Sequence, residues 1–147
     1  MRTLSIITLL TALLISIQSN AQKKKMKNRE IVTQFLEGFN DPTKIQQSMD
    51  LLADDYSFTN PMVSLNSKAE FIGLAQQIGA VLTGVNIIEV AENGEWVAAY
   101  YEFTSNIPGV ESNLATEWFR VEKGLIRESR LIYDASEWRK VYAQMEQ

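Results

Sequence analysis

The spacing of apolar residues changes at Thr83-Gly84, and this change constrains the fold more than any other feature of the chain. Before it, apolar residues recur every three to four positions, as on helices with one buried face. After it, they alternate with polar residues, as in strands joined by short turns. Helices followed by a run of strands predict an α+β fold, in which N-terminal helices pack on an antiparallel sheet.

Three helices are expected before the change of spacing. The first covers residues 29–40. The second starts at Asp41-Pro42, an N-cap followed by a proline, and ends near Asp54-Asp55. The third runs from the capping box that Ser67 opens to Leu82. Each carries an apolar stripe, so each is expected to bury one face.

Five strands and a last helix complete the predicted elements. Tyr56–Thr59 is short and stops before Asn60-Pro61, which predicts an edge strand because proline donates no ladder hydrogen bond. Tight turns are expected at Asn93-Gly94 and Lys123-Gly124. The remaining elements are strands at Val85–Ala91, Glu95–Thr104, Leu114–Val121 and Leu125–Tyr133, and a short C-terminal helix capped by Asp134.

Both faces of the predicted sheet carry apolar residues. Ala115, Phe119 and Val121 alternate with Leu114 and Trp118. Antiparallel sheets of monomers usually leave one face polar. A homodimer packed through the second face would explain the pattern, with a sheet curled around a larger pocket as the alternative.

The N-terminus predicts export. Arg2 precedes an apolar run over residues 4–17, which is too short to span a bilayer as a helix. The small residues Ser19 and Ala21 then precede an expected cleavage site after Ala21. We therefore expect a signal peptide at 1–21, a basic linker at 22–28 and one domain at 29–147. The mature protein would be periplasmic or secreted, with no membrane span.

Composition excludes several kinds of chemistry. The chain contains no cysteine and no histidine, so thiol nucleophiles, Ser-His-Asp triads and imidazole metal sites are ruled out. From Glu30 onward, eight basic residues face eighteen acidic ones, which disfavours nucleic acid as a partner. The Asp54-Asp55 pair is interpreted as a solvated helix end, and no phosphate-binding glycine loop is present. We therefore expect no metal and no cofactor.

Two segments carry a resemblance to a known family. Residues 51–61, LLADDYSFTNP, and 117–126, EWFRVEKGLI, resemble the nuclear transport factor 2-like superfamily, in particular its SnoaL-like branch. The resemblance covers about residues 29–145. It implies a curved sheet wrapped around the helices as a cone, an apolar pocket between them and frequent dimers.

The ketosteroid isomerases of this superfamily supply one template for the site. The resemblance places Asn60 where they carry the carboxylate that moves the proton, and an amide cannot act as that base. Phe35 or Leu36 stands near their oxyanion-hole tyrosine. Glu117 stands at the position of their protonated aspartic acid. One of three polar positions is retained.

Limonene epoxide hydrolases supply a second template. Asn60 matches their asparagine, and Glu102 retains an acid. Phe58 replaces their tyrosine, Tyr100 their arginine and Leu131 their final aspartate. The set of residues that activates water is therefore broken. The acid of SnoaL-type cyclases also falls near Leu131.

Alternatives remain for the pocket candidates. Glu117 shares a strand face with Phe119 and is either an acid that orients a ligand or a partner of an arginine on the next strand. Asn60 is a turn former or a pocket amide. Tyr100 and Glu102 belong either to the pocket wall or to a dimer interface.

The leading functional hypothesis is an exported domain that binds a small hydrophobic molecule in an apolar pocket. One alternative is an isomerase, cyclase or hydrolase of a hydrophobic carbonyl or epoxide compound, with Glu117 as acid and Glu102 as base. The other is a non-catalytic dimeric interaction module.

Overall fold

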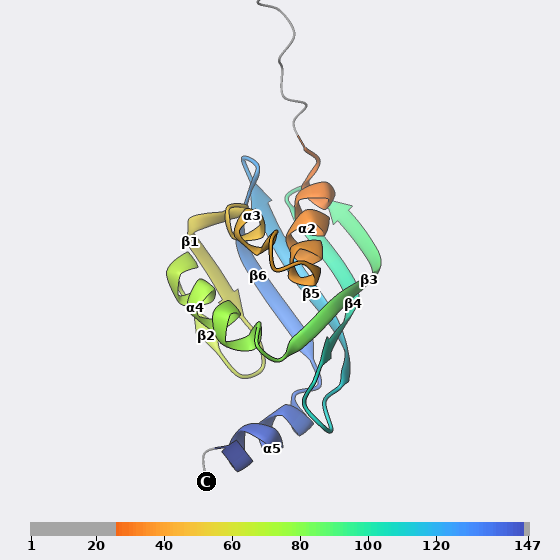
Figure 1. Cartoon of the computed structure of the whole chain (residues 1–147). Helices are drawn as coiled ribbons and strands as arrows, with labels where there is room; N and C mark the ends of the chain where they lie inside the picture. Colours follow the sequence, from red (N-terminus) through yellow and green to blue (C-terminus); the bar gives the residue numbers. More distant parts are fainter. Residues whose placement is uncertain (1–25, 146–147) are drawn as a thin grey trace, which may run out of the picture.

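A curved sheet with helices inside it forms the protein, as a computed structural model shows for residues 26–145 (Figure 1). The expected signal peptide at 1–21 and most of the basic linker lie outside these residues. The helices are α2 Asn28–Glu37, α3 Ile45–Met49, α4 Lys68–Ile78 and α5 Ser136–Met145, with a 3-10 turn η1 at Gly38–Asn40. The strands are β1 Leu52–Thr59, β2 Ser64–Leu65, β3 Leu82–Asn93, β4 Trp96–Ser105, β5 Ser112–Glu122 and β6 Leu125–Tyr133.

The six strands lie in the order β2-β1-β6-β5-β4-β3. The expected meander from β3 to β6 is confirmed, with antiparallel pairing throughout. Its β5–β6 hairpin turns at Lys123 and Gly124, whose φ angles of 53° and 84° are those that a tight turn between twisted strands requires. The sequence prediction of an α+β fold is confirmed.

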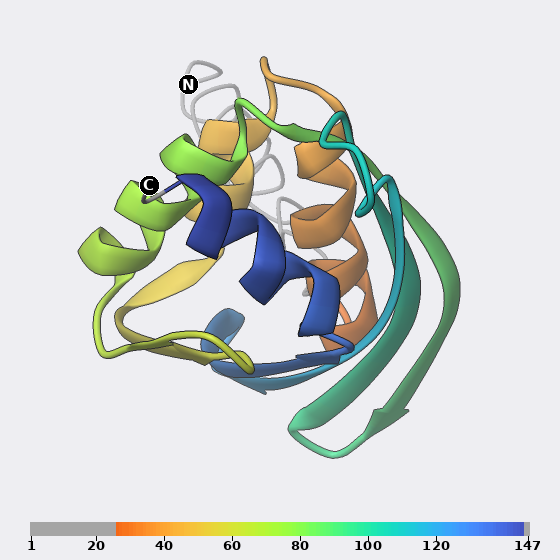
Figure 2. The same ribbon diagram turned by 90° about the horizontal axis from the view of Figure 1, so that it is seen from below.

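The sheet curves around α2, and its concave face holds the core (Figure 2). Register shifts leave an extra residue in β3 between Ile87 and Glu89 and in β6 between Ile126 and Glu128. Such bulges bend a strand and increase its twist. The apolar stripe of α2 packs onto the bent sheet, with the ring of Phe35 5.8 Å from that of Phe119. No helix among residues 26–145 is long and apolar enough to cross a membrane.

The second helix is much shorter than expected. It ends at Met49, and Asp54-Asp55 belong to β1. The helical spacing of Ile45, Met49 and Leu52 is overridden by a tertiary partner, because the Leu51 carbonyl accepts a hydrogen bond from the Ile126 amide at 2.8 Å.

The prediction of an edge strand at 56–59 is wrong for a related reason. β1 starts at Leu52, pairs on one side with β2 and on the other runs parallel to β6, with Phe58 opposite Ser129. The short β2 therefore forms the edge. The third helix also ends earlier than expected, at Ile78, and Leu82 opens β3.

The C-terminal helix α5 lies across the open end of the cone (Figure 2). Asp134 supports its first turn, since its Oδ1 accepts hydrogen bonds from the amide and hydroxyl of Ser136. Trp138 is buried and donates from Nε1 to Oδ1 of Asn113 at 2.9 Å. This bond ties α5 to the segment that begins β5.

Candidate functional site

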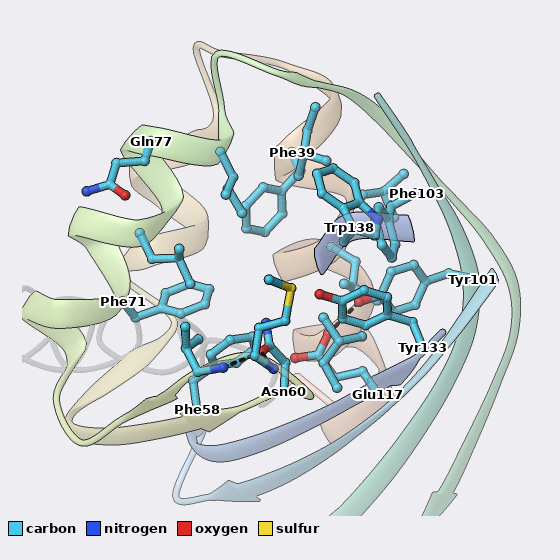
Figure 3. A pocket seen from close by; sticks show the side chains of 18 of the residues that line it. Phe39, Phe58, Asn60, Phe71, Gln77, Tyr101, Phe103, Glu117, Tyr133 and Trp138 are labelled. Carbon is cyan, nitrogen blue, oxygen red and sulfur yellow. Dashed lines mark hydrogen bonds between the residues drawn. The ribbon is translucent and has the colours of Figure 1, made fainter. Parts of the chain in front are cut away.

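An apolar cavity of about 400 Å³ lies between the concave face of the sheet and helices α2, α4 and α5 (Figure 3). This volume suits a small organic molecule. Much of its wall is aromatic, contributed by Phe35, Phe39, Phe58, Phe71, Tyr101, Phe103, Tyr133, Trp138 and Tyr142. Its polar groups include the side chains of Asn60, Gln77 and Glu117 and the hydroxyl groups of its tyrosines.

Glu117 is the acidic residue of this wall. It lies in the middle of β5 and points to the concave face, in phase with Ala115 and Phe119. Only 4% of its surface is exposed. The hydroxyl of Tyr101, on the neighbouring strand β4, donates to its Oε2 at 2.7 Å. A buried carboxyl group thus faces the cavity with a phenol beside it.

Burial raises the pKa of Glu117 from 4.5 to about 7. Hydrogen bonds from the hydroxyls of Ser129 and Tyr101 favour the ionised form and offset part of this effect. Burial and the neighbouring Glu117 also raise the pKa of Tyr101 well above 10, so this phenol stays protonated and acts as a donor. Near neutral pH, Glu117 is therefore able both to hold and to release a proton.

A second buried phenol extends this group of hydroxyls. Tyr56 of β1 is fully buried, and its hydroxyl lies 2.6 Å from that of Ser129 on β6. Ser129 in turn is a hydrogen-bonding neighbour of Glu117. The carboxyl group is thereby connected to three strands, which fixes its position.

Asn60 contributes to both a turn and the cavity. Its Oδ1 accepts hydrogen bonds from the amides of Met62 at 2.7 Å and Val63 at 2.8 Å, which closes the turn after β1. The residue also lines the cavity (Figure 3). Within residues 26–145 its amide nitrogen donates to no protein group.

The structure brings together five of the seven predicted pocket residues. Phe58, Asn60, Phe35, Glu117 and Leu131 all line the cavity.

Tyr100 and Glu102 do not line the cavity, and their assignment to the pocket wall is wrong. Alternate residues of a strand point to opposite faces, and Tyr101 and Phe103 occupy the concave side of β4. Tyr100 is 40% exposed on the convex face, and Glu102 accepts a hydrogen bond from the Ser112 hydroxyl there.

The arginines of β6 are not partners of Glu117. Arg127 pairs with Asp55 at 2.5 Å, and Arg130 pairs with Glu128 and lies over the ring of Trp96. Residues 26–145 contain no group of three or more acidic side chains close enough to hold a metal ion.

The cavity residues that were not among the predicted candidates include four aromatic ones. Tyr101, Phe103, Tyr133 and Trp138 form a run of neighbouring rings on the side where Glu117 lies (Figure 3). Strand parity puts Tyr101 and Phe103 on one face of β4, but it does not tell that this face is the concave one. The contribution of Trp138 depends on where α5 docks.

Comparison with known proteins agrees with this architecture. The family model of the SnoaL-like domain matches residues 32–129. The chain belongs to the SnoaL-like family. No protein of curated function matches this SnoaL-like domain.

Solved structures share the fold at low sequence identity. An NTF2-like protein of unknown function from Cytophaga hutchinsonii is 18% identical, with a TM-score of 0.69 over 82% of this chain and 98% of that one. A candidate polyketide cyclase from Xanthomonas campestris is 21% identical, with a TM-score of 0.64 over 76% and 96%. A candidate ketosteroid isomerase from Kribbella flavida is 16% identical, with a TM-score of 0.63 over 72% and 76%.

The SnoaL-like domain thus has one side chain suited to acid–base chemistry at its cavity. Glu102, expected as a base, lies on the other face of the sheet. Asn60 lies at the cavity but cannot take up a proton near neutral pH. The arrangement can bind an apolar molecule and contact its polar group.

Proposed function

We propose that the protein binds a small hydrophobic molecule in this cavity and holds one polar group of that molecule at Glu117 and Tyr101. The observation that supports the proposal is a buried carboxyl group at the wall of an otherwise apolar cavity of about 400 Å³. Burying a carboxyl group is unfavourable unless it is protonated or hydrogen-bonded. Its retention at the cavity is consistent with a role in binding.

Titration of the purified protein with fluorescent apolar compounds that each carry one polar group tests the proposal. Glu117→Gln should weaken binding about two- to tenfold, because one polar contact contributes about 0.5 to 1.5 kcal/mol. Glu102→Gln is the matched control, since it makes the same substitution on the convex face. Absence of binding, or equal affinity of both variants and wild type, would contradict the proposal.

A catalytic role is the second candidate, and the pKa of Glu117 near 7 favours it. A carboxyl group of this pKa can take a proton from a bound molecule and return it at neutral pH. The two-carboxylate version with Glu102 is not compatible with the structure. Any turnover would therefore rest on Glu117 alone and should be lost in Glu117→Gln.

We also propose that the protein acts after export, in the periplasm or outside the cell. The support is the arrangement of Arg2, the apolar run at 4–17 and the small residues before Gln22.

A further inference from the structure

The charged groups that line the cavity have only one sign, which is negative. Glu117 is its one acidic residue, and no lysine or arginine is among the described residues that line it. A bound anion would be desolvated next to this carboxyl group without a compensating charge. The cavity therefore disfavours fatty acids, phosphates and other anions.

The hydrogen bonds around Glu117 select further among polar groups. Tyr101 and Ser129 already direct their hydroxyl protons at the carboxylate. An ionised carboxylate has about four acceptor positions and no proton to donate. Its remaining positions need a hydrogen-bond donor, which the ligand has to supply.

Aromatic rings line the cavity on the side where Glu117 lies. The ring centroids of Tyr101 and Phe103 are 6.5 Å apart, those of Phe103 and Tyr133 5.4 Å, and those of Phe103 and Trp138 6.2 Å. Figure 3 shows these four side chains grouped on one side of the cavity, next to Glu117. Ring faces attract ammonium groups, most strongly where water is excluded.

We propose that the ligand is a hydrophobic amine, whose ammonium group lies against the Glu117 carboxylate within this group of rings. The proposal rests on the proposed binding function and names its ligand class. The surplus of ten acidic residues from Glu30 onward supports it, since a negative domain attracts cations.

The amine should bind better as Glu117 ionises. The titratable groups near the carboxyl are the phenols of Tyr56, Tyr101 and Tyr133, whose pKa values are all raised above 10, so they stay protonated. Burial and Tyr142 raise the pKa of Tyr133, and Arg139 of α5 partly offsets them. Between about pH 5 and 9, Glu117 is thus the group of this site that changes its charge.

Three probes of the same size test the ligand class on the purified full chain: naphthylethylamine, naphthylethanol and naphthylacetate. At about pH 8 the amine should bind about tenfold more tightly than the alcohol, because only the amine forms an ion pair with Glu117. The naphthylacetate anion should bind most weakly, because its charge is repelled by the carboxylate. Glu117→Gln should lower the affinity for the amine to that for the alcohol, while alcohol binding loses only the two- to tenfold expected for one polar contact. Glu102→Gln should retain the wild-type order.

A second measurement needs no variant. Between about pH 6 and 8, the affinity of the wild type for the amine should rise about tenfold, because the ionised fraction of a group with a pKa of about 7 rises by that factor. Affinity for the alcohol should stay constant.

The outcomes separate the two proposals. Equal affinity for amine and alcohol, or an amine preference that persists in Glu117→Gln, would overturn the amine assignment and leave hydrophobic binding standing. Failure of all three probes to bind would overturn the binding function itself.

Discussion

Glu117 combines two properties that oppose each other in a folded protein. Its carboxyl group is almost completely buried, yet no arginine or lysine pairs with it among the described residues, and only hydroxyl groups stabilise its charge. A group of this kind binds its proton more tightly in the native state than in the unfolded chain. It therefore makes the stability of the whole domain depend on pH.

The first prediction is a loss of stability as pH rises. Glu117 has a pKa of 4.5 when unfolded and about 7 when folded, so its favourable contribution is complete below about pH 4.5 and is lost as pH rises through 7. The loss is on the order of 3 kcal/mol, at about 1.4 kcal/mol for each tenfold change in proton affinity. Urea unfolding of wild type and Glu117→Gln at several pH values measures the difference.

The isosteric glutamine does not titrate, so Glu117→Gln should lose less stability than wild type between about pH 5 and 8. Glu102→Gln should follow the wild type. Parallel curves for wild type and Glu117→Gln would show that Glu117 keeps an ordinary pKa in the fold.

The second prediction concerns Asn60, which the resemblance to ketosteroid isomerases places where those enzymes carry the proton-moving carboxylate. Its Oδ1 is engaged by two backbone amides, and an amide does not accept a proton near neutral pH. The wild type should not isomerise a β,γ-unsaturated ketone above background, as followed by the ultraviolet absorbance of the conjugated product. Clear turnover, absent in Glu117→Gln, would replace the binding function with catalysis.

At the scale of elements, periodicity predicted the strands well. The bounds of β6 agree with the expected Leu125–Tyr133, because a tight turn at Lys123-Gly124 fixes its start and Asp134, which caps α5, follows its end. The parity of β5 likewise puts Glu117 on the face of Phe119. These features are local, so the sequence alone contains them.

Elements with a distant partner were predicted less well. Residues 52–55 were expected to continue the second helix, but Leu52 pairs with Ile126 of β6 and these residues open β1. For Tyr100 and Glu102, strand parity indicated that they share a face of the sheet. It did not tell which face is concave, since both faces carry apolar residues. The curvature of the sheet and the docking of α5 decide that question, and both depend on contacts between residues far apart in the chain.

The third prediction concerns the attachment of α5. Trp138→Phe keeps a ring next to Phe103 but removes the hydrogen bond to Asn113, which should weaken the docking of α5 by about 1 kcal/mol. Amide hydrogen exchange should then become about fivefold faster in α5 and stay unchanged in β4 and β5. Tyr142→Phe serves as control, because the Tyr142 hydroxyl makes no hydrogen bond within residues 26–145. Unchanged exchange in Trp138→Phe would show that the indole bond does not secure the helix.

On the scale of the whole molecule, the convex face of the sheet is the unusual surface. Leu114, Ile132, Trp118 and Tyr100 are each at least 40% exposed there. Four strands of about ten residues present roughly 600 Å² in projection, close to the roughly 800 Å² that a standard interface takes from each partner. Both charge signs occur around these residues, as in the pair of Arg120 and Glu128, so two copies can complement each other.

The fourth prediction is a homodimer through this face. Multi-angle light scattering at micromolar concentration should report about twice the chain mass. Trp118→Asp should shift the protein to the monomer, because it places a charge in the centre of the apolar surface. Gln76→Asp, on the exposed side of α4, should leave the dimer intact. A monomeric wild type, or a dimer that persists in Trp118→Asp, would rule out this interface.

The fifth prediction is the start of the mature chain. If the N-terminal residues act as a signal peptide, protein recovered outside the cytoplasm should begin at Gln22 and carry no lipid, because no cysteine is present. Intact mass spectrometry reads both properties at once. Recovery of a soluble cytosolic chain that still starts at Met1 would contradict export.

The parallel pairing of β1 with β6 also sets when the protein can become functional during its synthesis. Phe58 lies opposite Ser129, so β1 cannot complete its pairing until the ribosome has made β6, about seventy residues later. Contacts across such long loops form late and slow the folding of a domain. The cavity wall includes residues of both β1 and β6. A nascent chain therefore has no place for a ligand until translation has passed β6.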